Sequence, residues 1–164
     1  MTRFAHPYVL KKNGLERIVI QKMDAQDLEE VLFIETSASL TPWPLKMFIE
    51  EMQNPLAYCF VMKREDVSKP SIISFICFRN VIEESELLNI GVHPHYRQLG
   101  LGKKLMQFYI DFCYPLGIKT FYLEVNTSNQ AAIHLYQCFS YEPLGVRKKF
   151  YQGKCDALLM MKKV

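Results

Sequence analysis

The sequence predicts a single α/β domain with a central, mostly antiparallel, seven-stranded sheet flanked by four helices. Two observations carry this prediction. Seven short segments have the apolar patterns of strands, and four others have those of helices. One of these helices lies between two strands, and such a crossover implies a parallel pair, whereas the short polar linkers elsewhere favour hairpins and antiparallel neighbours.

The strands are predicted from runs of β-branched, aromatic and other apolar residues bounded by polar linkers. They cover residues 17–21, 57–63, 71–79, 86–92, 119–125, 141–151 and 157–161. Asp24 is expected to cap the first helix. Because proline disfavours helical geometry in the residue before it, Pro42 ends this helix, and the next begins just after Pro44 and runs to Asn54.

The third helix follows a glycine turn, and Pro115 and Gly117 end it. Its predicted core-facing residues recur at i, i+4, i+7 and i+11: Leu101, Leu105, Phe108 and Phe112. The fourth helix is predicted over residues 129–139. Residues 1–14 are polar and aperiodic, and we expect them to form an arm before a domain of residues 15–164.

Size, charge and cysteine content exclude several classes of protein. A chain of 164 residues, 49% apolar, can bury one sizeable core. Its net charge of +3 is too small to predict a nucleic-acid partner. The five cysteines form no CxxC pair, so we expect reduced thiols, no disulfide framework and no metal. No apolar run is long enough for a signal peptide or a membrane span, so we expect a cytoplasmic protein.

The sharpest motif runs from Arg97 to Lys104, between a predicted strand and an amphipathic helix. Glycines at positions 100 and 102 allow a ligand to approach the backbone closely. The free N–H groups of the helix's first turn and the helix dipole favour an anion there, and Lys103 and Lys104 add positive charge. The motif lacks the GK[ST] of a Walker A loop and is not GxGxxG. It therefore predicts a cradle for a pyrophosphate.

The alternative interpretation is a glycine-containing turn that only caps a helix. The glycines alone fit both interpretations about equally well. The complete arrangement of strand, RxxGxG and helix favours the anion site.

These residues resemble the acetyl-CoA motif of the GNAT superfamily of N-acetyltransferases. The run from Leu88 to Leu105, together with the later segments 123–125 and 128–136, resembles one branch closely. That branch is the bacterial ribosomal-protein alanine N-acetyltransferases (RimI-like) and their archaeal N-terminal acetyltransferase relatives. The resemblance covers about residues 83–161, with weaker matches at Glu35 and at Pro42-Trp43.

The resemblance implies a site for acetyl-CoA and a catalytic pair. Backbone groups of Ile90, Gly91 and Val92 would hold the pantetheine arm, and one of these amides would polarise the thioester carbonyl. The implied pyrophosphate-binding segment is Arg97, Gln98, Leu99, Gly100, Leu101, Gly102 and Lys103. Asn129 would bind the cofactor by a hydrogen bond. Glu124 would be the general base and Tyr136 the general acid.

The chemistry of acetyl transfer requires groups of these kinds. A free α-amine has a pKa near 8, so much of it is protonated at neutral pH and a base must remove the proton. Attack on the thioester makes an oxyanion, for which one well-placed donor is worth roughly 2.7–4 kcal/mol. The departing thiolate needs a proton, which a phenol of pKa about 10 can supply.

Each candidate also has a structural interpretation. Glu124 could be a solvent-facing or ion-paired strand glutamate, and Tyr136 a core tyrosine. The twelve-residue offset between them matches the family and favours catalysis. His93, His95 and His134 are expected to be turn or surface residues, and Cys138 a buried thiol without an oriented histidine. Trp43 fits an acceptor groove or a core equally well, and Tyr151 resembles a peptide-contacting position.

Two departures from the family pattern lie near the end of the chain. Where the family has Leu-Gly-Phe after the tyrosine helix, this chain has Phe139-Ser140-Tyr141, and we expect a different turn because serine tolerates left-handed geometry less well than glycine. The segment 152–155 is also short for a loop that would border the peptide entrance.

The leading hypothesis is transfer of acetyl from acetyl-CoA to the N-terminal α-amine of a protein, possibly a ribosomal protein, in a ternary complex. One alternative is a GNAT enzyme for a small amine, polyamine, aminoglycoside or lysine. Another is a non-catalytic acetyl-CoA-binding module. No nucleic acid, membrane or metal is expected to take part, and the sequence leaves monomer and dimer open.

Overall fold

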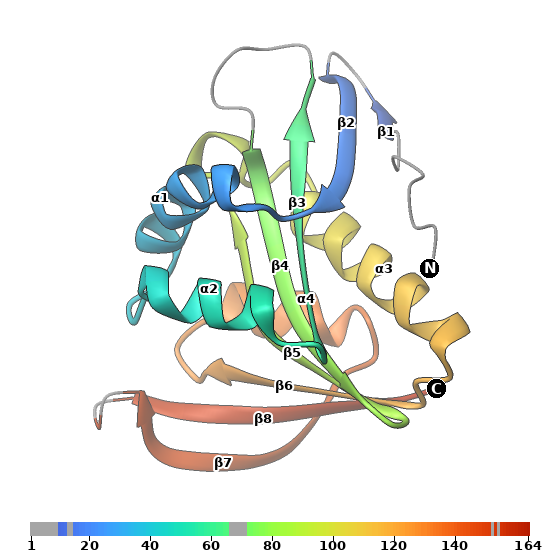
Figure 1. The fold of residues 1–164 in the computed structure, drawn as a ribbon. Helices are drawn as coiled ribbons and strands as arrows, with labels where there is room; N and C mark the ends of the chain where they lie inside the picture. The colour runs from blue at the N-terminus through green and yellow to red at the C-terminus, as the bar shows by residue number, and fades with distance from the viewer. Residues whose placement is uncertain (1–9, 13–14, 66–71, 152, 154) are drawn as a thin grey trace. The chain divides into compact units, whose positions relative to one another are not determined.

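A computed structural model describes residues 10–12, 15–65, 72–151, 153 and 155–164 of the chain. Its strands are β1 (Leu10–Lys12), β2 (Leu15–Lys22), β3 (Ala57–Arg64), β4 (Ile72–Val81), β5 (Glu84–Val92), β6 (Thr120–Asn126), β7 (Glu142–Tyr151) and β8 (Cys155–Lys163). Its helices are α1 (Leu28–Ala38), α2 (Leu45–Gln53), α3 (Leu101–Cys113) and α4 (Gln130–Gln137), with 3₁₀ turns η1 (Ala25–Asp27), η2 (Pro94–Tyr96) and η3 (Tyr114–Leu116). The predicted α/β class is confirmed (Figure 1).

The strand order is β1-β2-β3-β4-β5-β6-β8-β7. The described residues thus hold eight strands, one more than predicted, because β1 lies within the expected arm and pairs with β2. The rest of that arm, residues 1–9 and 13–14, lies outside the described residues. The predicted parallel pair is confirmed, since β5 and β6 pair in parallel from Glu84 with Thr120 to Leu87 with Leu123.

Two compact units make up the chain. One comprises Met1–Cys77 and Ile90–Leu101, and the other Phe78–Asn89 and Gly102–Val164. Strands β4 and β5 run from one unit into the other. The boundary falls between Leu101 and Gly102, inside the predicted pyrophosphate motif.

In the first unit, β2 and β3 form an antiparallel ladder with Ile20 opposite Met62. Helix α1 buries Leu28, Val31 and Ile34, and α2 buries Phe48. A row of aromatic rings continues from the loop before α2 into the sheet. Trp43 lies 5.2 Å from Phe48, and Phe48 meets Phe75 edge to face at 5.5 Å. Trp43 is half-buried, between the two environments expected for it.

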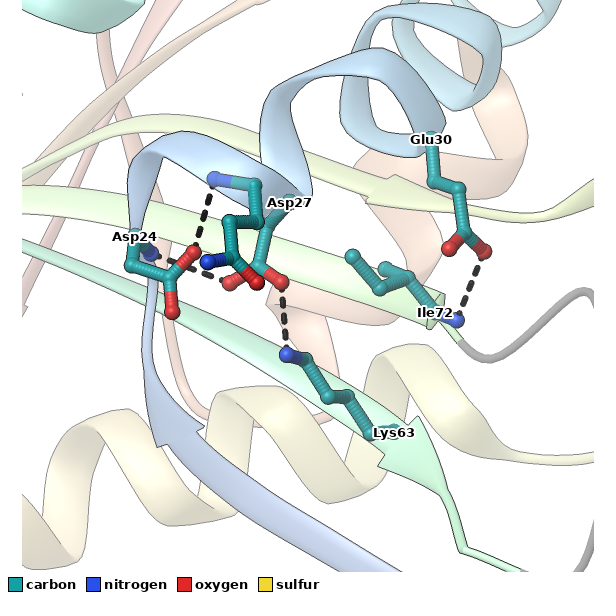
Figure 2. A network of polar contacts seen from close by, with 6 residues as sticks. Asp24, Asp27, Glu30, Lys63 and Ile72 are labelled. Atoms are coloured by element: carbon teal, nitrogen blue, oxygen red, sulfur yellow. Dashed lines mark hydrogen bonds and ion pairs between the residues drawn. The ribbon is translucent and has the colours of Figure 1, made fainter.

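A polar network holds the start of α1 (Figure 2). Asp24 and Asp27 form a capping box, in which the Asp24 carboxylate accepts the Gln26 N–H and the Asp27 carboxylate accepts the Asp24 N–H. The cap therefore belongs to η1, which leads into α1, and not to α1 itself as predicted. Lys63 on β3 then pairs with the buried Asp27 at 2.6 Å.

In the second unit, α3 buries a stripe that differs from the predicted one. Leu105, Tyr109 and Cys113 are fully buried and follow the i, i+4, i+8 row, whereas Phe108 and Phe112 lie at its flank. The Tyr109 hydroxyl lies 2.6 Å from Ser85 Oγ, so a tyrosine can occupy the centre of the stripe. Gly117 ends this segment with φ +80°, as predicted.

The remaining strands of the second unit are antiparallel. β6 pairs with β8 over its whole length, from Thr120 with Lys163 to Asn126 with Ala157. β7 pairs with β8 and lies at the end of the strand order (Figure 1). Its register shifts between Arg147 and Tyr151, which marks a bulge close to the turn into β8.

The Lys63–Asp27 pair generates a prediction on stability. Replacing Lys63 by Met leaves the buried Asp27 carboxylate without its cation, which we expect to lower the free energy of unfolding by about 2–3 kcal/mol. Urea unfolding measures the change. The matched control is Lys46→Met, because Lys46 pairs with Glu50 at the surface and should cost less than about 0.5 kcal/mol. Equal effects of the two variants would contradict the prediction.

Candidate active site

The loop before α3 has an unusual backbone conformation. Gln98 and Gly100 have positive φ values, +62° and +77°. Left-handed residues alternating with ordinary ones turn successive N–H groups toward one side and form a concave nest for an anion. Gln98 is strained there, since a residue with a Cβ rarely adopts this geometry. Strain at a ligand loop is a reason to look for function.

The residues present suit a pyrophosphate. A Cβ placed on Gly100 would meet no atom within 4 Å, so the backbone at Gly100 is open to an approaching group. The N–H groups of the first turn of α3, a helix of 13 residues, follow directly, and Lys103 is exposed within that turn. The first turn of a helix and a lysine within that turn both favour the binding of a negatively charged group.

Arg97 makes different contacts from those that the resemblance implies for it. Its Nε donates to the Val92 carbonyl at 3.1 Å, and its Nη2 donates to the Ser37 carbonyl at 3.0 Å. Ser37 lies in the last turn of α1, whose carbonyls need partners from outside the helix. The guanidinium thus joins the end of β5, the start of the loop and the end of α1.

The strand end that would hold the pantetheine arm is tightly packed on its inner side. In β5, Gly91 is buried between the half-buried Ile90 and Val92. A Cβ added to Gly91 would lie 2.5 Å from Phe75 Cε1 and 3.0 Å from Ile34 Cγ2. The glycine is therefore required by packing, because the Phe75 ring occupies the place of a side chain.

Glu35 and Trp43, which carry the weaker resemblance to the family in the first part of the chain, contact each other. Glu35 is buried in α1, and its Oε1 accepts the Trp43 N–H at 2.8 Å. A buried carboxylate oxygen is satisfied in this way, and the chain is fixed where it turns from α1 toward α2.

The proposed base lies on β6. Phe121, Leu123 and Val125 are buried on one face of this strand, and Glu124 points to the other. The Glu124 side chain is 16% exposed, and its carboxylate pairs with Arg147 of β7 at 2.9 Å. Burial raises the pKa of Glu124 above its usual value, Arg147 lowers it, and Glu86 on β5 raises it. The ion-paired interpretation of this residue is therefore correct as a description, and it is compatible with a carboxyl prepared to accept a proton.

Side chains at the end of β6 build the start of α4. Asn126 Oδ1 accepts the Ser128 N–H at 2.9 Å and the Ser128 hydroxyl at 2.8 Å. Asn129 is the N-cap, and its Oδ1 accepts the Ala132 N–H at 3.1 Å. The carbonyl of the Asn129 amide is thus used by the helix, and its NH₂ group is the part that can reach a cofactor.

The proposed acid, Tyr136, is buried at the end of α4. Its carbonyl accepts the Tyr141 N–H at 3.1 Å, while the Ser140 N–H donates to Gln137 at 2.9 Å. Together these bonds form a Schellman motif. Ser140 has φ +63°, so the prediction of a different turn is wrong: serine adopts the left-handed geometry that glycine would have.

A family comparison settles the class of the chain. Residues 24–141 match the model of the acetyltransferase (GNAT) family. This protein is a GNAT-family N-acetyltransferase. Members of the family transfer an acetyl group from acetyl-CoA.

The GNAT chain is similar to bacterial enzymes named for ribosomal protein bS18. It is 31% identical over 144 residues to the [ribosomal protein bS18]-alanine N-acetyltransferase of Escherichia coli K12, covering 86% of this chain and 94% of that one. It is 27% identical over 146 residues to the putative enzyme of that name from Bacillus subtilis, covering 88% and 94%. The crystal structure of the E. coli enzyme superposes with a TM-score of 0.79 at 30% identity, covering 90% and 94%.

Sequence reasoning missed two contacts in this GNAT chain. Nothing in the sequence of β7, which has basic residues at positions 147, 148 and 149, singles out Arg147. The expectation of a buried Cys138 without a histidine partner is wrong: its thiol is exposed and lies 3.9 Å from His134 Nε2. The spacing of these residues, i and i+4 on a helix, could have shown their proximity.

Other predictions for the lesser candidates are confirmed where the structure describes them. His93 caps η2 as a turn residue, with Nδ1 accepting the His95 N–H at 3.2 Å. Burial lowers the pKa of His93. All five cysteines are free, and burial raises the pKa of Cys113 to about 11. In the segment 152–155, Gln152 and Lys154 lie outside the described residues, as does the Tyr151 side chain.

The packing of Gly91 generates a prediction for this GNAT domain. We expect Gly91→Ala to lower the free energy of unfolding by about 1–3 kcal/mol, because the new methyl group must displace the Phe75 ring. Chemical denaturation measures this. Combining it with Phe75→Leu should recover part of the loss. An unchanged stability of the single variant would show that the ring moves freely.

The left-handed Ser140 generates a second prediction. Ser140→Gly should raise the free energy of unfolding by about 0.5–1 kcal/mol, because a left-handed serine costs more than the extra chain entropy of glycine. Thermal unfolding at fixed protein concentration measures the gain. Ser128→Gly is a suitable control, since Ser128 uses its hydroxyl to bond Asn126 and should lose stability. A loss in both variants would contradict the strain argument.

Proposed function

We propose that this enzyme transfers acetyl from acetyl-CoA to the N-terminal α-amine of a protein, by direct attack in a ternary complex. The observation that carries the proposal is the environment of Glu124. The Glu124 carboxyl is half-buried on β6 and pairs with Arg147 at 2.9 Å, and burial raises its pKa, which favours acceptance of a proton from an α-ammonium group.

The cofactor side of the proposal rests on the loop before α3. The N–H groups of residues 98–103 bind the pyrophosphate, with Lys103 adding charge and Arg97 holding the loop to α1. Backbone groups of Ile90, Gly91 and Val92 hold the pantetheine arm, and the Asn129 amide adds a hydrogen bond. Acetyl-CoA supplies the acetyl group as a thioester, whose carbonyl one of these N–H groups polarises.

The catalytic side rests on two side chains of consecutive elements. Glu124 removes the proton of the acceptor amine, and the freed lone pair attacks the carbonyl carbon. Tyr136 donates its phenolic proton to the departing sulfur. Tyr136 lies at the end of α4, whose position the Schellman bonds at Tyr141 and Ser140 fix. A fixed donor avoids the cost of orienting it during the reaction.

The acceptor class is proposed from the similar proteins. The enzymes of E. coli and B. subtilis are named for the alanine of ribosomal protein bS18. A protein beginning with alanine, of ribosomal origin, is therefore the first acceptor to test here. Ribosomal proteins are made in the cytoplasm, so the proposal places the enzyme there.

The proposal predicts a specific pattern of acetyl transfer. Release of free CoA thiol should occur with short peptides that begin with alanine, and blocking the peptide α-amine should abolish it. A panel of polyamines, aminoglycosides and lysine is the comparison. Turnover only with that panel would reassign the acceptor class, and no turnover with either panel would contradict catalysis.

The same assay tests the two assigned residues. Glu124→Gln and Tyr136→Phe should each reduce kcat by about 10²–10⁴-fold, while binding of acetyl-CoA, measured by calorimetry, stays the same. Tyr114→Phe is a matched control for the loss of one hydroxyl, because Tyr114 is exposed in η3, and it should keep full turnover. Full turnover of Tyr136→Phe would exclude the assigned acid.

A further inference from the structure

The second unit contains an ion pair, between Arg147 and Glu124, that the proposed function does not use. Arg147 Nη1 lies 2.9 Å from Glu124 Oε1. The two side chains differ in exposure, 59% for Arg147 and 16% for Glu124. A surface ion pair of two long, mobile side chains stabilises a protein little. Here, however, one partner is the proposed base, so the geometry of the pair bears on activity.

The backbone around Arg147 is fixed by contacts that hold a bulge. Arg147 is paired with Ala157 of β8, and the register shifts directly after it. Lys149 has φ +52°, and its N–H donates to Asp156 Oδ1 at 2.9 Å. Lys148 Nζ lies 3.1 Å from Asp156 Oδ2. A bulge of this kind redirects the side chains beside it.

Asp156 also connects the bulge to β6. Its carbonyl accepts the Thr127 N–H at 3.1 Å, one residue after the end of that strand. One residue of β8 therefore fixes both the bulge next to Arg147 and the end of the strand that carries Glu124. The guanidinium has a second restraint, since its carbon lies 4.8 Å from the centre of the Phe150 ring.

We propose that Arg147 is a positioning residue that holds the Glu124 carboxylate ionised and in one orientation for the transfer reaction. This inference rests on the proposed role of Glu124 as the base. A glutamate has three side-chain torsions, and a charge-assisted bond to a restrained guanidinium selects among their rotamers. The ring of Phe150 and the bulge restrain the guanidinium in turn.

The charges around Glu124 define what the loss of Arg147 would do. Glu86 faces it from β5 and Arg147 from β7, while the residue opposite it on β8 is the apolar Leu159. Burial and Glu86 both favour the protonated carboxyl, and Arg147 opposes them. Removing Arg147 therefore raises the pKa of Glu124, so the base is lost at a higher pH than in the parent enzyme.

The test is the pH profile of kcat/KM with an alanine-terminated peptide. For Arg147→Met, the acidic limb should move to higher pH, with roughly a three- to tenfold loss at acidic pH that shrinks as the pH rises. Arg147→Lys keeps the charge and should keep the limb near its parent position. Glu86→Gln should move the limb in the opposite direction.

A matched control is Lys119→Met, which removes the cation of another glutamate ion pair, with Glu83, and should leave the profile unchanged. An acidic limb that stays at its parent position for Arg147→Met would overturn the proposal. If Arg147→Met does not fold, Arg147→Gln, which keeps a polar but shorter and uncharged side chain, carries the same expectation. Glu124→Gln separates the two proposals. If Glu124→Gln is inactive while the Arg147 variants match the parent enzyme, only the inference on Arg147 fails. Full activity of Glu124→Gln would instead refute the role of Glu124 as the base.

Discussion

The close approach of the Phe75 ring to Gly91 is the constraint on which the first unit depends. The ring lies where a side chain of β5 would be, and it also receives the edge of Phe48, which packs on Trp43. The packing therefore links the strand end proposed for the pantetheine arm with α2 and the loop before it. Close-packed interiors transmit such displacements, so a methyl group at position 91 acts on both.

In the second unit, the corresponding constraint is the electrostatic environment of Glu124. Glu124 is buried enough for its pKa to rise, and Arg147 limits that rise without removing it. The proposed role of Glu124 as the base depends on both influences, because burial favours the protonated carboxyl and Arg147 favours the ionised one. The Arg147 side chain is largely exposed, so solvent screens its charge and weakens its effect on the pKa of Glu124. Its proposed contribution is therefore the orientation of the Glu124 carboxylate as much as the electrostatic effect.

The sequence alone predicted the order of elements, the single crossover and the glycine loop, because these follow from local patterns of apolar, proline and glycine residues. It predicted the stripe of α3 only in part, since burying Tyr109 depends on the distant hydroxyl of Ser85. It also misjudged Ser140, because the bonds at Tyr136 and Gln137 impose a left-handed serine that intrinsic preference disfavours. Tertiary contacts decided each of these cases.

The contacts of Arg97 and Arg147 likewise show which features of the candidate site the sequence alone does not predict. A motif identifies Arg97, and its contacts with Val92 and Ser37 show that it holds the loop whose backbone we propose as the anion site. No motif identifies Arg147, whose position follows from a bulge that Asp156 fixes. Backbone N–H groups and a restrained guanidinium are both oriented before any ligand arrives. Both proposed halves of the reaction, binding the anion and removing the proton, thus rely on groups whose orientation the fold has already fixed.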